Sequence, residues 1–264
     1  MVSNMQWPAL NKFSMLLINN NRSKAYLQNL TKCGYCPEFV IVLDYGNEAL
    51  PEHSENEPYR LNGSEQKLIR HCPEAGLSFN EKEHILVTLR HNNISHKVLN
   101  TMDANSSEVI EMLKSCPGEY IVYSGPGGAI LQKDILSAGK HMIHTHSGWL
   151  PDYRGSTSFY YSLLTGDEIS CSVIVLTEEI DKGNVFYRRR FQTGTTMNVD
   201  YVLDPAVRAA SLVDFFNINR GQSLNPIPIP NEKYQEMFFI IHPVLKHLAL
   251  LSLDKKNNDN TIQH

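Results

Sequence analysis

The order of secondary structure expected at the start of the chain limits the fold more than any other feature. Residues 13–18 form an apolar run that predicts a buried strand, residues 24–33 carry apolar side chains at helical spacing, and residues 38–43 form a second apolar, β-branched run. A strand, a helix and a strand in this order make the unit of a parallel sheet, because the helix crosses over one face. We therefore expect an α/β fold: a Rossmann-like, mostly parallel twisted sheet with helices on both faces and a short C-terminal helical extension.

The rest of the chain continues this pattern with two irregular stretches. Residues 44–82 are polar and predict a long loop with one helix near residues 66–69. The proline-rich residues 221–230 predict an extended linker. Between these stretches the pattern predicts strands over residues 84–90, 95–99, 119–123, 140–146 and 170–177, and an antiparallel strand over 184–191. It also predicts one helix that begins at residues 106–108 and three more over 131–138, 156–165 and 204–216.

The chain is expected to divide near residue 191. Residues 1–191 would form the α/β catalytic domain, and residues 192–264 would supply a helix, the linker and an apolar tail that packs on the core or on a partner. In the tail, residues 234–247 include Phe238 and Phe239. This segment would complete a substrate pocket, form a dimer contact or serve only in packing, and the sequence leaves these alternatives open.

The composition excludes several classes of protein. With 42% apolar and 20% charged residues and a formal net charge of -4, the 264 residues describe an ordinary globular chain in which a nucleic-acid partner is not favoured. The five cysteines are odd in number and scattered along the chain, so we expect reduced thiols. We find neither a signal segment nor a membrane span, and we therefore expect a cytoplasmic protein. Cys33 and Cys36 have the spacing of half a zinc site, but no second pair closes it.

The stretch 144–155 is the first candidate for chemistry. His144 and His146 lie two residues apart at the end of a predicted strand, so their side chains share one face. Gly148 and Pro151 end the strand, and loops at the carboxyl ends of strands are the usual active sites of open α/β sheets. The glycines of residues 124–128 follow another strand; they either let a ligand approach the backbone or form a tight turn into a helix.

Two histidines with an aspartate can also bind a divalent metal. A metal-dependent amide hydrolase or deformylase is therefore a competing class. However, we find no further cluster of histidine or acidic residues with ligand spacing, and we expect no metal.

Several short motifs between residues 144 and 183 together resemble a known family. The sequence has His144-Thr145-His146, then Leu-Pro-Asp-Tyr-Arg-Gly over residues 150–155, a helix that ends at Gly166-Asp167, a β-branched strand, and Asp181-Lys182-Gly183. This composite resembles the formyltransferase family that uses 10-formyltetrahydrofolate, whose members include methionyl-tRNA, glycinamide ribonucleotide and sugar-nucleotide N-formyltransferases. The resemblance covers roughly residues 119–190.

The resemblance implies a set of site residues. His146, Asp181 and His144 would be catalytic, and the formyl donor 10-formyltetrahydrofolate would bind at Gly127, Gly128, Ala129, Ile130 and Leu131. Tyr153, Arg154 and Gly155 would bind the substrate. His144 stands where the family has asparagine; an imidazole N–H could replace the amide N–H as the oxyanion donor, in the correct tautomer or in the protonated form.

The acceptor expected from the resemblance is a small amine, such as an amino sugar nucleotide or a modified amino acid. Methionyl-tRNA formyltransferases carry a sizeable C-terminal domain, and the net negative charge here disfavours tRNA. We expect no membrane partner, and a homodimer is a candidate assembly. The alternatives are a formyl-folate hydrolase, the metal-dependent amide hydrolase, and a catalytically silent binding protein on the same fold.

Overall fold

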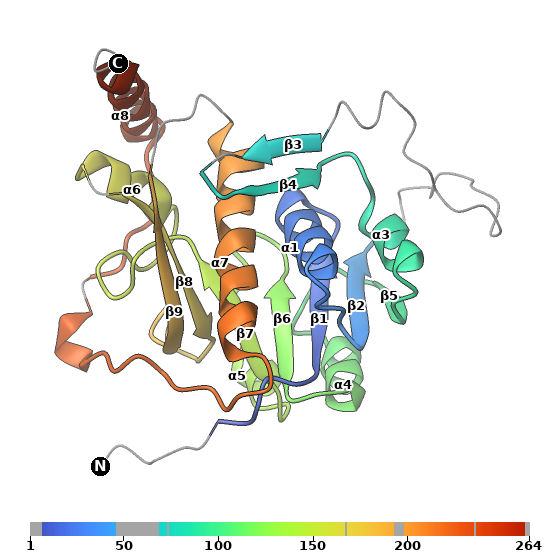
Figure 1. Cartoon of the computed structure of the whole chain (residues 1–264). Coiled ribbons are helices and arrows are strands. Elements are labelled where there is room, and N and C mark those ends of the chain that lie inside the picture. Colours follow the sequence, from blue (N-terminus) through green and yellow to red (C-terminus); the bar gives the residue numbers. More distant parts are fainter. Residues whose placement is uncertain are drawn as a thin grey trace.

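Seven strands form one sheet in the computed structural model, which describes residues 7–45, 69–72, 74–166, 168–192, 198–234 and 236–261. The strand order is β5-β2-β1-β6-β7-β8-β9 (Figure 1). The first five strands in this order, from β5 through β2, β1 and β6 to β7, are parallel to one another. Strand β8 runs antiparallel to β7, and β9 runs antiparallel to β8. The bounds are β1 Phe13–Ile18, β2 Phe39–Asp44, β5 His96–Asn100, β6 Tyr120–Ser124, β7 His141–His146, β8 Ile169–Val175 and β9 Asn184–Phe191.

Helices cover both faces of this sheet, so the expected α/β class is confirmed. One face carries α1 (Asn21–Lys32), α3 (Ile85–His91), α6 (Ser158–Leu164) and α7 (Asp204–Asn219), and the other carries α4 (Ser107–Ser115) and α5 (Lys133–Leu136). The alternation of side chains along the strands divides the core accordingly: Met15 and Leu17 of β1 join one hydrophobic cluster, and Leu16 joins the other.

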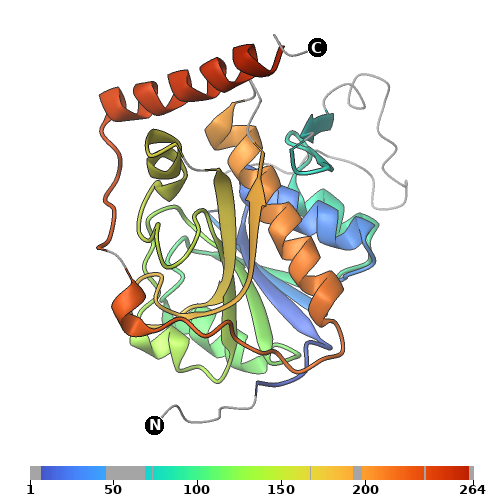
Figure 2. The ribbon, with the colours of Figure 1, turned by 60° about the vertical axis from the view of Figure 1, so that its left-hand side comes forward.

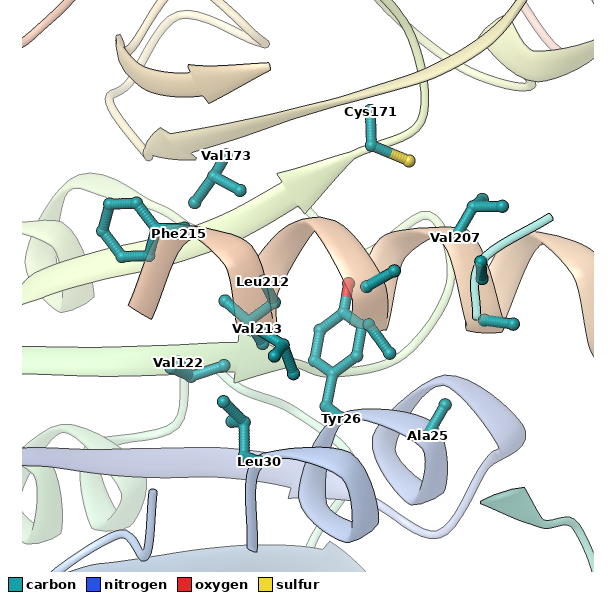
Figure 3. Packing of buried hydrophobic residues seen from close by; sticks show 14 of the residues in the cluster. Ala25, Tyr26, Leu30, Val122, Cys171, Val173, Val207, Leu212, Val213 and Phe215 are labelled. Atoms are coloured by element: carbon teal, nitrogen blue, oxygen red, sulfur yellow. The ribbon is translucent and has the colours of Figure 1, made fainter. Parts of the chain in front are cut away.

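The packing of α1 on α7 forms the centre of the larger cluster (Figure 3). Tyr26 of α1 is fully buried and points toward α7, whose small residues Ala206, Ala209 and Ala210 leave room for it. Such small side chains permit close approach of two helices, and full burial of one aromatic ring contributes about 2–3 kcal/mol.

Most strands expected from the sequence are confirmed, but the one expected over residues 84–90 is wrong. This segment is α3. The side chain of His84 caps the helix by accepting the amide N–H of Leu86 (3.2 Å), and Ile85 and Leu89 are buried one helical turn apart. The β-branched composition of the segment favours a strand in isolation, and packing against α1 overrides this preference.

The stretch expected to be a long loop contains a hairpin. Strands β3 (Ile69–Cys72) and β4 (Leu77–Asn80) pair antiparallel, and Phe79 joins the core beside α1. The helix expected near residues 66–69 lies outside the described residues except for Ile69, which begins β3.

The helix α7 occupies the predicted region and starts from a preceding turn. A π-helical turn, η1 (Val199–Leu203), leads directly into α7, and Asp204 is the first α-helical residue. Its carboxylate accepts hydrogen bonds from Arg208 one turn later, at 2.9 Å to each oxygen. Asp204 therefore fixes a guanidinium in place instead of capping the helix.

The C-terminal segment crosses the molecule and ends in α8 (Pro243–Thr261), which packs against α6 (Figure 2). The 3-10 turn η2 (Asn231–Lys233) precedes it. Ile241, Ala249 and Leu253 are buried, and the helix continues to Thr261. None of the helices in the described ranges has the length and apolar character needed to cross a bilayer. The domain division near residue 191 stays a prediction; α7, beyond it, shares a hydrophobic cluster with α1.

Candidate functional site

A cavity of about 650 Å³ opens at the carboxyl ends of β6 and β7. The expected catalytic residues His144, His146 and Asp181 line it together, as do residues 127–131 and Gly155. The side chains of Tyr153 and Arg154 are not among its lining residues. Topology explains why the loop after β6 meets the histidines of β7, because parallel strands deliver their carboxyl ends to one edge of the sheet. Asp181 follows the antiparallel strand β8 and reaches this edge through the turn between β8 and β9.

His146 contacts Asp181 through one ring nitrogen and the backbone of Tyr153 through the other. The Nδ1 atom of His146 lies 3.4 Å from Oδ1 of Asp181, and Nε2 lies 2.7 Å from the carbonyl oxygen of Tyr153. A carbonyl oxygen only accepts, so Nε2 carries the hydrogen and the neutral ring presents a lone pair at Nδ1. Nδ1 faces Oδ1 of Asp181, so a proton placed on Nδ1 would point at the carboxylate. Both residues are nearly buried, at 5% and 9% exposure.

Backbone geometry holds Asp181 in this position. Asp181 has a φ of 53°, in the left-handed region that aspartate tolerates better than most residues. Its Oδ2 accepts the amide N–H of Gly155 at 2.7 Å, which leaves Oδ1 for His146. The turn closes tightly because Gly183 lies against the carbonyl oxygen of Val175, where a Cβ atom would collide.

The conformation of the loop after β7 is set by close packing at Gly148 and by two hydrogen bonds with Ser172. A Cβ atom on Gly148 would lie 2.6 Å from the carbonyl oxygen of Tyr153, the same oxygen that His146 bonds. The hydroxyl of Ser172 on β8 donates to the carbonyl of Gly148 (2.7 Å) and accepts the amide of Leu150 (3.0 Å). Strand β8 thereby fixes the loop that orients His146.

Tyr153 and Arg154 support the loop. The Tyr153 hydroxyl lies 2.6 Å from the hydroxyl of Thr165, and the Arg154 guanidinium donates to the carbonyl of Ile180 at 2.9 Å, next to Asp181. Their position outside the cavity lining favours a structural contribution over the direct substrate contact expected from the sequence.

His144 lies in a cationic environment that the sequence did not reveal. Burial, followed by the nearby charges of Arg208 and Arg22, holds the pKa of His144 well below its ordinary value of 6.5. Of the two forms considered from the sequence, this environment selects the neutral imidazole. The Nδ1 atom of His144 is buried and has no hydrogen-bond partner among the described residues.

Arg22 and Arg208 both line the cavity and were missed. Arg208 donates to the carbonyl of Thr145, between the two histidines, at 2.7 Å. Burial opposes its charge, but Asp204 together with Tyr26 and Cys171 outweighs burial and raises the pKa of Arg208. Arg208 stands among Val207, Ala209 and Ala210, and a lone cation within an apolar helical pattern is the signal that could have identified it. Arg22 lies in the polar first turn of α1, where the sequence gives no such signal.

The glycine-rich loop is held from the other side of the cavity. The side chain of Asn105 donates to the carbonyl of Ile130 (3.0 Å) and accepts the amide of Gln132 (2.8 Å). A Cβ atom at Gly127 or Gly128 would meet nothing within 4 Å, so open space adjoins the backbone there. Across the described chain the amides of these two glycines have no protein partner, which leaves them available to a ligand.

Residues 237–240 form a wall of the cavity that sequence reasoning raised only as one alternative. Phe238 pairs with Gly155 in a parallel bridge: its amide donates to Arg154, and its carbonyl accepts from Ser156, both at 2.9 Å. Its ring stacks on Tyr161, with centroids 4.4 Å apart. The cavity is thus completed by a segment from far along the chain.

A metal site is not formed by the described residues, which contain no group of three or more histidine, cysteine or acidic side chains placed to hold an ion. In addition, the two ring nitrogens of His146 face Tyr153 and Asp181. Cys33 and Cys36 are free and exposed, away from the cavity lining.

A mostly parallel α/β sheet with a histidine–aspartate pair at the carboxyl ends of its strands defines the class of this protein. The model of the formyl transferase family matches residues 71–202, half of the chain. The chain belongs to the formyl transferase family.

Curated relatives agree with this assignment over part of their length. The chain is 30% identical over 139 residues to the methionyl-tRNA formyltransferase of Finegoldia magna, covering 52% of this chain and 41% of that protein. It is 30% identical over 118 residues to the Listeria monocytogenes enzyme of the same name, covering 42% and 38%. The matches therefore span about two fifths of these relatives.

Solved structures share the fold over nearly the whole chain. A sugar N-formyltransferase from Shewanella sp. FDAARGOS_354 aligns with a TM-score of 0.52 and 13% identity, covering 92% of this chain and 87% of that one. Glycinamide ribonucleotide transformylase 1 from Symbiobacterium toebii aligns with a TM-score of 0.52 and 13% identity, covering 86% and 99%. The expected Rossmann-like architecture is thereby confirmed.

Proposed function

We propose that this protein transfers a formyl group from 10-formyltetrahydrofolate to the amine of a small acceptor. The observation that carries the proposal is the pairing of His146 Nδ1 with Asp181 Oδ1 on the wall of the cavity, beside His144. Formyl transfer to an amine needs a base for the proton that the amine loses and a donor for the charge that develops on the formyl oxygen.

The cavity fits the proposed formyl donor. Its volume of about 650 Å³ lies within the usual range for small-molecule sites, roughly 300–1,000 Å³. The free amides of Gly127 and Gly128 suit the polar edge of a flat heteroaromatic ring, and Leu131 and Leu176 offer it apolar contact. When bound, the folate would supply the activated formyl carbon.

The histidine–aspartate pair would act as the proton acceptor. Tyr153 fixes the hydrogen on Nε2 of His146, so the free lone pair is at Nδ1. A proton from the attacking amine would be held between Nδ1 of His146 and Oδ1 of Asp181. Gly155 keeps the other carboxylate oxygen occupied and thereby directs Oδ1 to this task. A positioned base of this kind contributes about 10²–10⁴-fold to a rate.

His144 would stabilise the charge on the formyl oxygen. A backbone hydrogen bond with Tyr123 engages the ring, and its buried Nδ1 has no partner among the described residues. In the tautomer with the hydrogen on Nδ1, the neutral ring would donate this N–H to the formyl oxygen. Burial and the two arginines beside it lower the pKa of His144 and keep the ring neutral, and the arginines make this part of the cavity electropositive. We assign Tyr153 and Arg154 to positioning, because their side chains hold the loop from outside the cavity lining.

The acceptor in this proposal is a small amine, such as an amino sugar nucleotide or a modified amino acid. The curated relatives act, by name, on methionyl-tRNA, but the matched part is about two fifths of their length. The net charge of -4 gives little long-range attraction for a polyanion. A homodimer remains a candidate assembly.

Radiolabelled formyl transfer tests the proposal. Protein is incubated with 10-formyltetrahydrofolate labelled in the formyl group, with and without a panel of amines, and formamide products are separated from free formate. We expect amine-dependent product, and a loss of about 10²-fold or more in Asp181→Asn. Asp134→Asn, an exposed carboxylate on α5, is the matched control. Formate release that no amine alters would instead identify a hydrolase, and product only with methionyl-tRNA would refute the small acceptor. Tight folate binding without turnover would identify a silent binding protein.

A further inference from the structure

Strands β6 and β7 separate immediately before the two histidines. Their pairing ends at Val122 and Ile143, although β6 continues to Ser124 and β7 to His146. Among the described strands, residues 144–146 therefore pair with β8 alone. Strands that part in this way leave backbone groups without a ladder partner on the open side, and each of these groups needs another partner when it is buried.

The carbonyl of Thr145 is one of these backbone groups. The amide of His141 donates to the residue before β6, and the carbonyl of Met142 accepts from the residue after β8, each at 2.8 Å. Backbone groups alternate between the two sides of a strand, so Thr145, four residues after His141, directs its carbonyl toward the side of β6. Arg208 donates to this carbonyl at 2.7 Å. A side chain of α7 thus takes the place of the strand partner that β6 no longer provides.

The guanidinium of Arg208 is itself held in place. Its Nε lies 2.9 Å from each carboxylate oxygen of Asp204, and its Nη1 bonds Thr145, so one planar group joins α7 to β7. The side chain of Arg208 is 15% exposed and lines the cavity, whereas Asp204 is not among the lining residues. The family model matches residues 71–202, so neither member of this pair falls within it.

The same guanidinium adds a charge next to His144. Burial is the largest cause of the lowered pKa of His144, and the charge of Arg208 is the next. Arg22 of α1 and His146 of β7 lower this pKa further, and a backbone hydrogen bond with Tyr123 of β6 raises it. Loss of Arg208 would therefore both free the carbonyl between the histidines and remove a cation, and a test has to separate these two effects.

We propose that Arg208 is a positioning residue for formyl transfer, which holds the backbone between His144 and His146 in place of a strand partner. The inference rests on the proposed function for the reaction, and on backbone geometry alone for the positioning. Both histidines line the cavity from this segment, so a shift at Thr145 moves both rings relative to a bound substrate. A misplacement of about 1 Å near reacting groups can reduce a rate about 10²-fold.

Formyl-transfer kinetics of four variants test the positioning. Arg208→Gln removes the guanidinium, Arg208→Lys keeps the charge without the planar fork, and Asp204→Asn removes the group that holds the guanidinium. Arg189→Gln is the matched control, because it breaks another arginine–aspartate pair (2.7 Å) outside the cavity lining.

We expect kcat and kcat/KM to fall together, by about 10- to 100-fold in Arg208→Gln and by less in Asp204→Asn and Arg208→Lys, with no change in Arg189→Gln. A lower melting temperature with unchanged kcat would show that Arg208 is only structural and would overturn the proposal. If Arg208→Gln does not fold, Asp204→Asn and Arg208→Lys decide by the same criterion.

Nitrogen NMR of protein labelled in its histidine rings tests the positioning without any reaction. The signals of His144 and His146 are identified by their loss in His144→Asn and His146→Asn, and are followed over a pH titration. In Arg208→Gln we expect both ring signals to shift and the pKa of His144 to rise, because a nearby cation is lost. In Asp204→Asn the cation remains, so both ring signals should shift without a rise in the pKa of His144.

The two measurements separate this inference from the proposed function. Ring signals that match those of the unmodified chain in both variants would refute the positioning, whether or not any amine is formylated. A change confined to the pKa of His144 would assign Arg208 an electrostatic effect only and would also overturn the proposal. Shifted rings in a protein that formylates no amine would count against the proposed function and leave the positioning supported.

Discussion

Gly155 contacts both Phe238 in the cavity wall and the carboxylate of Asp181. The variant Gly155→Ala tests whether these contacts are required for stability and for formyl transfer. Gly155 has a φ of 98°, a left-handed conformation that strains any residue with a Cβ atom. An added Cβ would collide with the carbonyl oxygen of Phe238 and lie 2.6 Å from Cγ of Met237. The methyl group therefore cannot fit unless residues 237–238 move away.

The cost can be worked from these contacts. The backbone conformation alone costs about 1–2 kcal/mol for alanine. Moving Phe238 also breaks its two backbone hydrogen bonds, to Arg154 and Ser156, each worth about 1 kcal/mol net. We expect Gly155→Ala to lower the free energy of unfolding by roughly 3–4 kcal/mol.

Gly139→Ala is the matched control. Gly139 has a φ of 79°, and an added Cβ would meet nothing within 4 Å, so this variant carries the conformational strain without the collision. We expect it to lose only about 1–2 kcal/mol.

Denaturant unfolding, hydrogen exchange and formyl transfer together provide the assay. Gly155→Ala should speed amide exchange across residues 236–242 and reduce formyl transfer, since the amide of Gly155 holds Asp181. Gly139→Ala should change neither. Equal losses of stability in the two variants, with unchanged exchange at residues 236–242, would refute the claim that this segment is an integral wall of the cavity.

Three further predictions concern pH, the C-terminal helix and the donor loop. The pKa of His144 is lowered in the folded state, so near that pH the unfolded chain binds a proton that the folded chain does not. The free energy of unfolding should therefore fall as the pH drops below about 6.5. Denaturant unfolding at several pH values should show that His144→Asn reduces the slope of this free energy against pH by up to about 1.4 kcal/mol per pH unit. An unchanged slope would contradict the burial of His144. Lys246→Met removes the ion pair with Asp200 (2.5 Å), which should cost less than about 1 kcal/mol globally yet speed hydrogen exchange in α8; exchange at the unmodified rate would show that the pair does not hold the helix. Asn105→Ala should raise KM for the formyl donor about 3- to 10-fold with little change in kcat, because it removes the two hydrogen bonds that hold the glycine loop, and a fall in kcat alone would argue against this role.

The sequence was sufficient to predict the strands that carry the site. Buried strands such as β1 and β7 are short apolar runs with turn residues on both sides, and that local signal needs no tertiary information. The spacing of His144 and His146 likewise places both side chains in one cavity, because the pleat repeats every two residues. Where local preference and tertiary packing disagreed, as in α3, the sequence reading failed.

Contacts between distant segments explain what remained hidden. The hydrogen on Nε2 of His146 is fixed by the carbonyl of Tyr153, and the neutral state of His144 by burial beside Arg22 and Arg208. Neither arginine is near the histidines in the sequence, and both are brought there by helices that pack over the sheet.

The sequence by itself therefore determined the α/β class, the glycine-rich loop and the two histidines, since these depend on periodicity and short motifs, and the resemblance to a known family added Asp181. Only the tertiary structure decided that Arg22 and Arg208 line the cavity beside the histidines and that residues 237–240 form one of its walls. The physical reason is that burial and charge are sums over neighbours far apart along the chain, and no local pattern encodes which of them will meet.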